Sequence, residues 1–180
     1  MTWPDGTKYT GEFVDGKFNG EGEKTLPNGT KFKGAFKDDK FIGREITYPN
    51  GNKYSGDTKD GKPNGKGLMT WVTGETYDGY FVKQKRTGYG IETRPDGTTY
   101  KGQFKNGKYN GKGVQTLPDG SKIAGTFTNG EYVGEGTVKF ADGRIYKGTM
   151  KKGKAHGQGT MTWPDGKKYT GDFRNNERNG

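Results

Sequence analysis

Residues that could carry catalytic chemistry are scarce in this chain. Histidine occurs once, at His156, serine occurs only at Ser55 and Ser121, and cysteine is absent. Nucleophilic catalysis needs a hydroxyl or thiol beside a base that activates it. Because the three residues lie far apart in the sequence, we expect no Ser/His or Cys/His dyad. The chain is therefore predicted not to be an enzyme, and neither a metal site nor a cofactor is expected.

Carboxylates recur at regular intervals, but their setting indicates turns and not acid–base catalysis. The recurring aspartates, each followed by glycine, are Asp5, Asp96, Asp119, Asp142 and Asp165. An aspartate in such a turn accepts a hydrogen bond from its own backbone two residues further on. The repeated Gly-x-Gly pairs lack the third glycine and the following helix of a nucleotide-binding loop. We interpret both patterns as structural.

The spacing of the aromatic residues identifies an internal repeat. Counted from Tyr9, corresponding residues recur every 23 positions, except for one interval of 22 in the repeat that begins at Phe32. A single array over 1–180 is predicted. Its repeats are expected at 9–31, 32–53, 54–76, 77–99, 100–122, 123–145 and 146–168, with partial repeats at 1–8 and 169–180.

Each repeat carries the turn chemistry of a β-hairpin. In Pro118-Asp119-Gly120, proline presets φ and glycine accepts a left-handed backbone, which predicts a type I turn with a glycine bulge between two antiparallel strands. Counting outward from a three-residue turn pairs Gln115 with Ile123. The predicted fold class is all-β: an elongated single-sheet array of antiparallel β-hairpin repeats, twisted into a trough-shaped ribbon without helices.

The same count places glycines opposite one another. Gly113 faces Gly125, and the pair leaves a gap in the sheet surface that aromatic rings can cover. Tyr100 and Phe104 flank Gly102 and are expected to lie over such a gap. Gly102, Gly113 and Gly125 are therefore predicted to be structural, because a larger residue would hold the rings away.

Lysine occupies one repeat position almost throughout. Its members are Lys17, Lys40, Lys62, Lys85, Lys108 and Lys154. They are expected to line one edge of the ribbon, where they would suit anionic headgroups or simply form a solvated rim that protects the edge. The net charge of +10 favours acidic partners. The basic residues are too dispersed, and the rings too necessary for stacking, for nucleic acid to be the expected partner.

The aromatic face should be mostly core, because so thin a fold has no other. Rings near the middle of the array are expected to stay open as an apolar stripe for a helix or an extended peptide. The candidates for this protein-binding groove are Trp71, Tyr77, Tyr100 and Tyr109.

The consensus Tyr-x-Gly-x-Phe, then Gly-Lys-x-x-Gly-x-Gly and an aromatic before Pro-Asp-Gly, resembles the membrane occupation and recognition nexus (MORN) repeat. Residues 146–150, 153–159 and 163–166 reproduce almost the full motif, and the match covers nearly the whole chain. The choline-binding cell-wall repeat fits less well, because it depends on tryptophans to cage a quaternary amine and this chain has 3.

Some repeats depart from the family pattern. The histidine that the family often has before Gly-x-Gly is present only as His156, which argues against a metal-binding role for that position. The second repeat has Asp39 and Glu45 in place of glycines, and the fourth has Gln84 and Arg94 in place of a glycine and an aromatic residue. We expect these repeats to bend the array or to mark a contact.

The resemblance implies an assembly or targeting module, since such repeats occur in phosphoinositide kinases, junctional proteins, a lysine methyltransferase and cytoskeletal scaffolds. A protein or peptide partner, or a second copy, is expected; anionic phospholipids or phosphoinositides are the alternative. The parent protein could carry a separate catalytic domain, such as a phosphoinositide kinase. The expected location is the cytoplasm, with a peripheral membrane location under the lipid alternative.

The two ends of the sequence read as interior repeat segments. Residues 1–6 repeat 161–166, and the chain stops part-way through a repeat at Gly180. We therefore expect a segment of a longer array whose uncapped ends associate, either as a two-fold dimer or head to tail as a filament.

Overall fold

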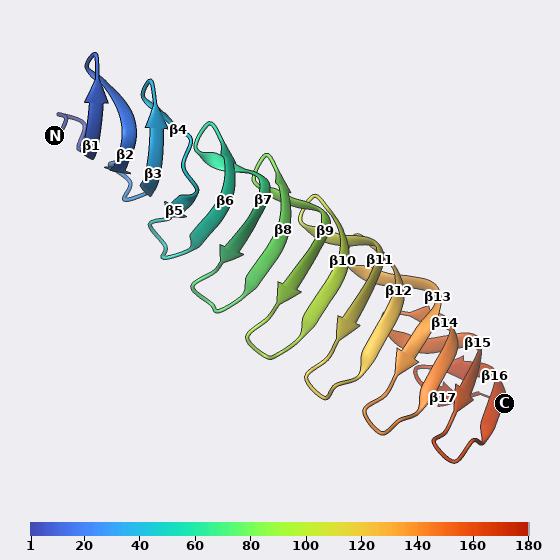
Figure 1. Cartoon of the computed structure of the whole chain (residues 1–180). Coiled ribbons are helices and arrows are strands. Elements are labelled where there is room, and N and C mark those ends of the chain that lie inside the picture. The colour runs from blue at the N-terminus through green and yellow to red at the C-terminus, as the bar shows by residue number, and fades with distance from the viewer. Residues whose placement is uncertain (180) are drawn as a thin grey trace. The chain divides into compact units, whose positions relative to one another are not determined.

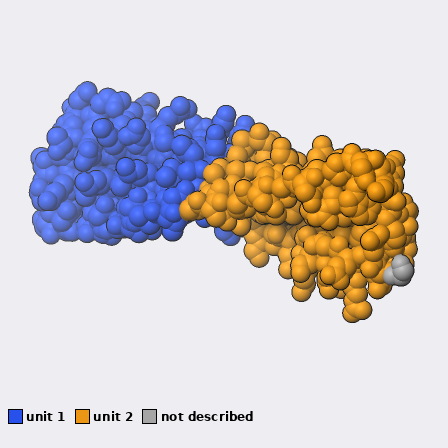
Figure 2. All heavy atoms as spheres, turned by 90° about the horizontal axis from the view of Figure 1, so that it is seen from below, with its two compact units in different colours: residues 1–86 blue, residues 87–180 orange. Residues whose placement is uncertain are grey.

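The computed structural model describes residues 1–179, which form 17 strands and no helix (Figure 1). Gly180, which the expected last repeat includes, lies outside the described residues. The chain divides into two compact units, Met1–Arg86 and Thr87–Gly180, which Figure 2 colours separately. The all-β fold class is confirmed. With no helix in residues 1–179, none of them forms a helical membrane span.

Within each unit the strands follow one another as antiparallel hairpins (Figure 1). The first strands are β1 (Lys8–Val14), β2 (Lys17–Thr25), β3 (Lys31–Lys37), β4 (Lys40–Phe41), β5 (Glu45–Thr47), β6 (Lys53–Lys59), β7 (Lys62–Thr70), β8 (Thr76–Val82) and β9 (Lys85–Thr93). They are followed by β10 (Thr99–Lys105), β11 (Lys108–Thr116), β12 (Lys122–Thr128), β13 (Glu131–Lys139), β14 (Ile145–Lys151), β15 (Lys154–Thr162), β16 (Lys168–Arg174) and β17 (Glu177–Arg178).

The turn predicted at Pro118-Asp119-Gly120 joins β11 to β12. The Gly120 amide donates to the Leu117 carbonyl at 2.9 Å, and Gly120 has φ +84°. Asp119 Oδ1 accepts from the Ser121 amide at 2.8 Å. Equivalent bonds to the carboxylates of Asp5, Asp96, Asp142 and Asp165 hold the pKa of each below its ordinary value. These aspartates are turn residues, as predicted.

A second, tighter turn joins each predicted hairpin to the next one. Between β10 and β11 it consists of Asn106 and Gly107, with φ +51° and +83°. Positive φ at both residues of a two-residue loop is the type I′ geometry, for which Asn-Gly and Asp-Gly are the preferred pairs. Lys108 begins the strand directly after this turn, so the repeated lysine lies at a hairpin tip.

The predicted register is confirmed, with Gln115 opposite Ile123. The glycines pair across every strand of the second unit from β9 to β16. This glycine ladder consists of Gly90, Gly102, Gly113, Gly125, Gly136, Gly148, Gly159 and Gly171. A line without side chains therefore crosses the strands on the face that carries the rings, which we call the ring face; the opposite side of the sheet is the polar face.

The repeat tyrosine lies across this ladder, as expected. A Cβ atom added to Gly113 would lie 2.3 Å from the Tyr100 hydroxyl, and the hydroxyl donates to the Gln103 carbonyl at 3.1 Å. The strand register shifts between Gly102 and Phe104, so this hydroxyl bonds a carbonyl at a β-bulge. Tyr54 and Tyr146 make the same bond three residues on, at 2.6 and 2.7 Å.

The core forms because a repeat tyrosine contacts a phenylalanine of the next hairpin, as Tyr9, Tyr54, Tyr100 and Tyr146 do. Tyr100 lies edge-to-face with its own Phe104, at 5.2 Å between ring centres, and with Phe127 on β12, at 5.1 Å. Tyr100 is 0 % exposed and Phe127 is 2 % exposed. Since each ring is buried by its neighbour, burial in the unit is built from successive hairpins.

Two repeats lack the tyrosine, and another ring takes its place. The repeat that begins at Ile123 seats Tyr132 on the ladder, where the Tyr132 hydroxyl donates to the Ala124 carbonyl at 3.1 Å. The repeat that begins at Phe32 seats Phe41, whose ring would lie 2.5 Å from a Cβ atom on Gly43. Both replacements come nine positions after the missing tyrosine, so one seat is shared by two sequence positions.

Burial of these tyrosines predicts a loss of stability at high pH. Burial, with a smaller contribution from a nearby carboxylate, raises the pKa of Tyr54 and of Tyr100 to about 12, against about 10 in the unfolded chain. Between about pH 10 and 12 the unfolded state ionises and the folded state does not, so stability is full below about pH 10 and falls as pH rises through this window.

Urea unfolding measured across this pH range checks the expectation. The lysines also titrate there, so the informative quantity is the difference between the wild type and Tyr54→Phe or Tyr100→Phe, which keep every lysine. Each substitution is expected to flatten the decline. Identical slopes in the wild type and both variants would show that these hydroxyls do not cause it.

Candidate functional site

The four groove candidates do not form an open apolar stripe. Tyr77 and Tyr100 are both 0 % exposed, and Tyr109 is 7 % exposed, because these rings fill the space above the glycines. Tyr109 stacks on Tyr100 with 3.7 Å between ring centres and 7° between ring planes. Trp71 stays partly exposed, with the Arg86 guanidinium 5.5 Å from its ring centre. The groove expectation is therefore wrong at the three tyrosines, which are core.

A buried carboxylate lies beside Tyr109. Glu92 is 3 % exposed and accepts hydrogen bonds from the Tyr109 hydroxyl and, at 3.0 Å, from Nε of Arg94. Arg94 also donates to the Tyr109 hydroxyl at 2.9 Å. At the position of this carboxylate several other repeats have an apolar residue, such as Met69, Val138 or Met161, while the first and fifth have Lys24 and Gln115. Arg94 was recognised in the sequence as irregular, but its partner was not.

All six lysines of the repeated position are exposed. In four repeats the register places a second lysine directly opposite, across the tight turn. These pairs are Lys37 with Lys40, Lys59 with Lys62, Lys105 with Lys108 and Lys151 with Lys154. Like charges directly opposite each other disfavour the hairpin, so each tip concentrates positive charge at a cost in stability.

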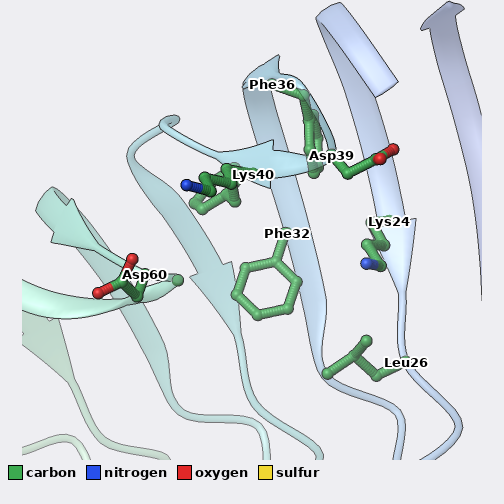
Figure 3. Close-up of a pocket in the computed structure, with 9 residues that line it drawn as sticks. Lys24, Leu26, Phe32, Phe36, Asp39, Lys40 and Asp60 are labelled. Atoms are coloured by element: carbon green, nitrogen blue, oxygen red, sulfur yellow. The ribbon is translucent and has the colours of Figure 1, made fainter. Parts of the chain in front are cut away.

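A pocket opens on the ring face of the first unit at the repeat that is one residue short. Figure 3 shows Phe32 in its centre, between Lys24 and Lys40, with the Asp60 carboxylate at its rim. Its volume is about 350 Å³. Phe41 has taken the seat over the glycines and lies 5.1 Å from Phe32, which leaves Phe32 partly exposed.

The polar face is hollowed in both units at the same repeat position. In the second unit the hollow, about 500 Å³, runs over the backbone of three ladder glycines and is lined by Tyr89, Lys101, Lys112, Val114, Thr126 and Glu135. Tyr89 is 50 % exposed and Val114 is 38 % exposed. We call this the Tyr89 hollow. The sequence signal for it was an aromatic ring at a position that Lys66 and Lys112 occupy in other repeats.

The corresponding hollow of the first unit has the opposite charge. It measures about 470 Å³ and is lined by Thr10, Glu21, Glu23 and Lys33 with two glycines. Glu21 and Glu23 stand at the positions of Lys112 and Val114. The repeat therefore supplies the same shape twice, and the side chains give it different chemistry. Among residues 1–179, no three histidine, aspartate or glutamate side chains gather as a metal site.

Comparison with known proteins identifies the repeat. The model of the MORN repeat family matches residues 9–31, 54–76, 77–99, 100–122, 124–143, 146–168 and 169–180. The chain belongs to the MORN repeat family. The stretch between the first two matched ranges is the 22-residue repeat that begins at Phe32, where the strands β4 and β5 replace one long strand. No curated protein matches the sequence of this MORN chain.

Of two matching solved structures, the first shares the fold of this MORN array at low sequence identity. The TCP domain of SAS-4 (dCPAP) from Drosophila melanogaster, in complex with a proline-rich motif of Ana2 (dSTIL), matches 93% of this chain and 90% of its own, with 15% identity and a TM-score of 0.59. The TCP10 domain of Danio rerio CPAP matches 96% and 92%, with 19% identity and a TM-score of 0.40.

Proposed function

We propose that this MORN array is a non-catalytic interaction module that binds a peptide segment of a partner protein on its polar face. The observation that carries the proposal is the fold that it shares with the SAS-4 TCP domain, which is a domain in complex with a proline-rich motif. The repeat tyrosines support the choice of face, since they are buried on the other one and Tyr89 and Val114 are exposed.

A second candidate is attachment to a membrane surface of anionic phospholipid, with the chain in the cytoplasm and peripheral to that membrane. The observation that favours it is the doubling of the tip lysines, since a like-charged pair such as Lys105 and Lys108 disfavours the hairpin unless an anion neutralises it. Each lysine near a charged membrane contributes up to about 1 kcal/mol.

One experiment with two arms separates the candidates. Binding of the full chain is measured to a set of proline-rich, acidic and basic peptides. It is also measured to phosphatidylcholine vesicles with and without phosphatidylserine, and each measurement is repeated over a salt series. Binding to peptides that persists at high salt is expected under the first proposal, because buried apolar contact is not screened. No binding to any peptide would overturn that proposal.

Vesicle binding that needs phosphatidylserine and fades with salt would support the second candidate. The variant with Lys105→Gln and Lys108→Gln should then lose vesicle affinity. Its matched control replaces Lys122 and Lys139, an exposed cross-strand lysine pair on β12 and β13 that lies at the end away from the tight turn of that hairpin, and should bind as the wild type. Equal loss in both variants would show that net charge alone, and not the tips, drives binding.

A further inference from the structure

Equivalent side chains recur across the Tyr89 hollow at a fixed distance, which is set by the spacing of the strands. Tyr89 on β9 and Lys112 on β11 hold the same position in successive repeats, with β10 between them, where Gln103 is the cross-strand neighbour of Tyr89. Neighbouring strands lie about 4.8 Å apart, so corresponding side chains are spaced about 9.6 Å apart across the sheet. A ligand that crosses the strands meets equivalent positions at this interval.

One regular peptide conformation has the same period. Polyproline II has three residues per turn and rises about 3.1 Å per residue, so residues i and i+3 face the same side about 9.3 Å apart. An extended strand covers about 9.9 Å in three residues, but i and i+3 then point to opposite sides. An α-helix returns to the same face after seven residues and about 10.5 Å. Its mismatch with the spacing of about 9.6 Å is therefore about three times that of polyproline II.

The side chains of the hollow set the chemistry of such a ligand. The half-exposed ring of Tyr89 offers a surface for a proline ring, and Val114 adds an apolar contact. Lys112 lies one repeat further on, and Lys101 lies on the strand between them. These two lysines outnumber the carboxylate of Glu135, so the hollow favours an acidic residue three positions from that proline.

We propose that the Tyr89 hollow binds a proline-rich, acidic segment in the polyproline II conformation, laid across β9, β10 and β11. A proline lies on Tyr89, and a glutamate or aspartate three residues away lies at Lys112. This inference rests on the proposed peptide-binding function and adds to it the place, the conformation and the spacing. The acidic counterpart in the first unit, with Glu21 and Glu23, does not accept this segment.

The test uses a probe whose side chains follow the same order in either chain direction. It is a labelled heptapeptide with a central glutamate flanked by three prolines on each side, titrated against the full chain by fluorescence anisotropy and NMR. Replacing both prolines three positions from the glutamate by alanine is expected to weaken binding about tenfold, and replacing both prolines two positions away much less. A lysine in place of the glutamate should abolish binding.

Substitutions that the repeat itself already contains keep the fold intact. Tyr89→Lys introduces lysine, which other repeats have at this position as Lys66 and Lys112. Lys112→Glu introduces glutamate, which the next repeat has as Glu135. Each substitution is expected to lower the affinity for the probe about tenfold. Lys101→Glu should also weaken it. Its matched control is Lys147→Glu, an exposed lysine at the same repeat position outside the hollow, which should leave affinity unchanged.

The outcomes separate this inference from the proposed function. Equal affinity for the two alanine peptides would overturn the spacing, and full affinity of Tyr89→Lys for the probe would overturn the site. If the probe fails and other peptides of the set bind, the inference falls and the peptide-binding function stands. If no peptide binds, both fall.

Discussion

Gly113→Ala is expected to lower the free energy of unfolding by about 3 kcal/mol, although it adds only one methyl group. The new Cβ atom would lie 2.3 Å from the hydroxyl oxygen of Tyr100 and 2.5 Å from Cζ of its ring. The ring must therefore leave its seat, break its bond to the Gln103 carbonyl and lose its contacts with Phe104 and Phe127. Overpacking typically costs about 1–3 kcal/mol, and an unpaired buried acceptor adds to it.

Urea unfolding of the full chain measures this loss, and two variants identify its cause. Gly120→Ala places a methyl group at φ +84° with nothing within 4 Å, so it reports backbone strain alone and is expected to cost about 1 kcal/mol. Tyr100→Ala by itself is expected to cost about 3–5 kcal/mol. In that background Gly113→Ala should cost little, since the clashing ring is gone. If the losses in the free energy of unfolding from Gly113→Ala and Tyr100→Ala were additive in the double variant, the Tyr100 ring would not lie over Gly113.

The other two predicted structural glycines meet different obstacles. A Cβ atom on Gly102 would lie 2.5 Å from the Cα atom of Gly113, so it collides with backbone that no side-chain substitution can relieve. A Cβ atom on Gly125 would meet the hydroxyl of Tyr132. Relief of Gly125→Ala is therefore expected from Tyr132→Ala.

That difference shows how far the sequence could predict the fold. Proline, aspartate and glycine at fixed spacing determine a turn, and the turn determines the strand register. The pairing of Gly113 with Gly125 could therefore be predicted by counting residues outward from the turn. The seat of Tyr132 did not follow, because a consensus treats each position separately. Here one space above the ladder is filled by either of two positions, and only the packing decides which one.

The candidate site was less predictable for a similar reason. Periodicity assigns side chains to a face, but it does not say which rings the neighbouring hairpins cover. Tyr77 and Tyr100 were expected to lie open and are fully buried. Tyr89 stands at a repeat position that is mostly charged, so an aromatic ring there was a departure from the pattern. The consensus did not show this departure, because it records only the commonest residue at each position.

The buried carboxylate supplies the second large effect. Arg94→Leu is expected to destabilise the array by about 3 kcal/mol, because it removes a charged partner from Glu92, which is 3 % exposed. Glu92 is the buried member of this pair, and the Arg94 side chain is 45% exposed. Removing one partner of a fully buried ion pair typically costs about 3–5 kcal/mol, so a loss at the lower end of that range is expected. Leucine itself fits the position, since Leu117 holds it in the next repeat. The loss therefore reports the charge and not the shape.

Replacing the whole group should restore stability. The triple variant with Glu92→Met, Arg94→Leu and Tyr109→Phe uses residues that other repeats have at these positions, and it removes the buried charge and the hydroxyl together. Apolar replacement of a buried ionic group is often neutral or stabilising, so the triple variant should unfold at a urea concentration at or above that of the wild type.

A surface ion pair provides the control for these measurements. Arg144 and Asp142 lie 2.7 Å apart, but their side chains are 39% and 53% exposed. Arg144→Leu should therefore cost less than about 1 kcal/mol. If the triple variant were as unstable as Arg94→Leu, the buried group would be stabilising the array through its hydrogen bonds. The carboxylate of Glu92, the guanidinium of Arg94 and the hydroxyl of Tyr109 would then act together as a polar part of the core.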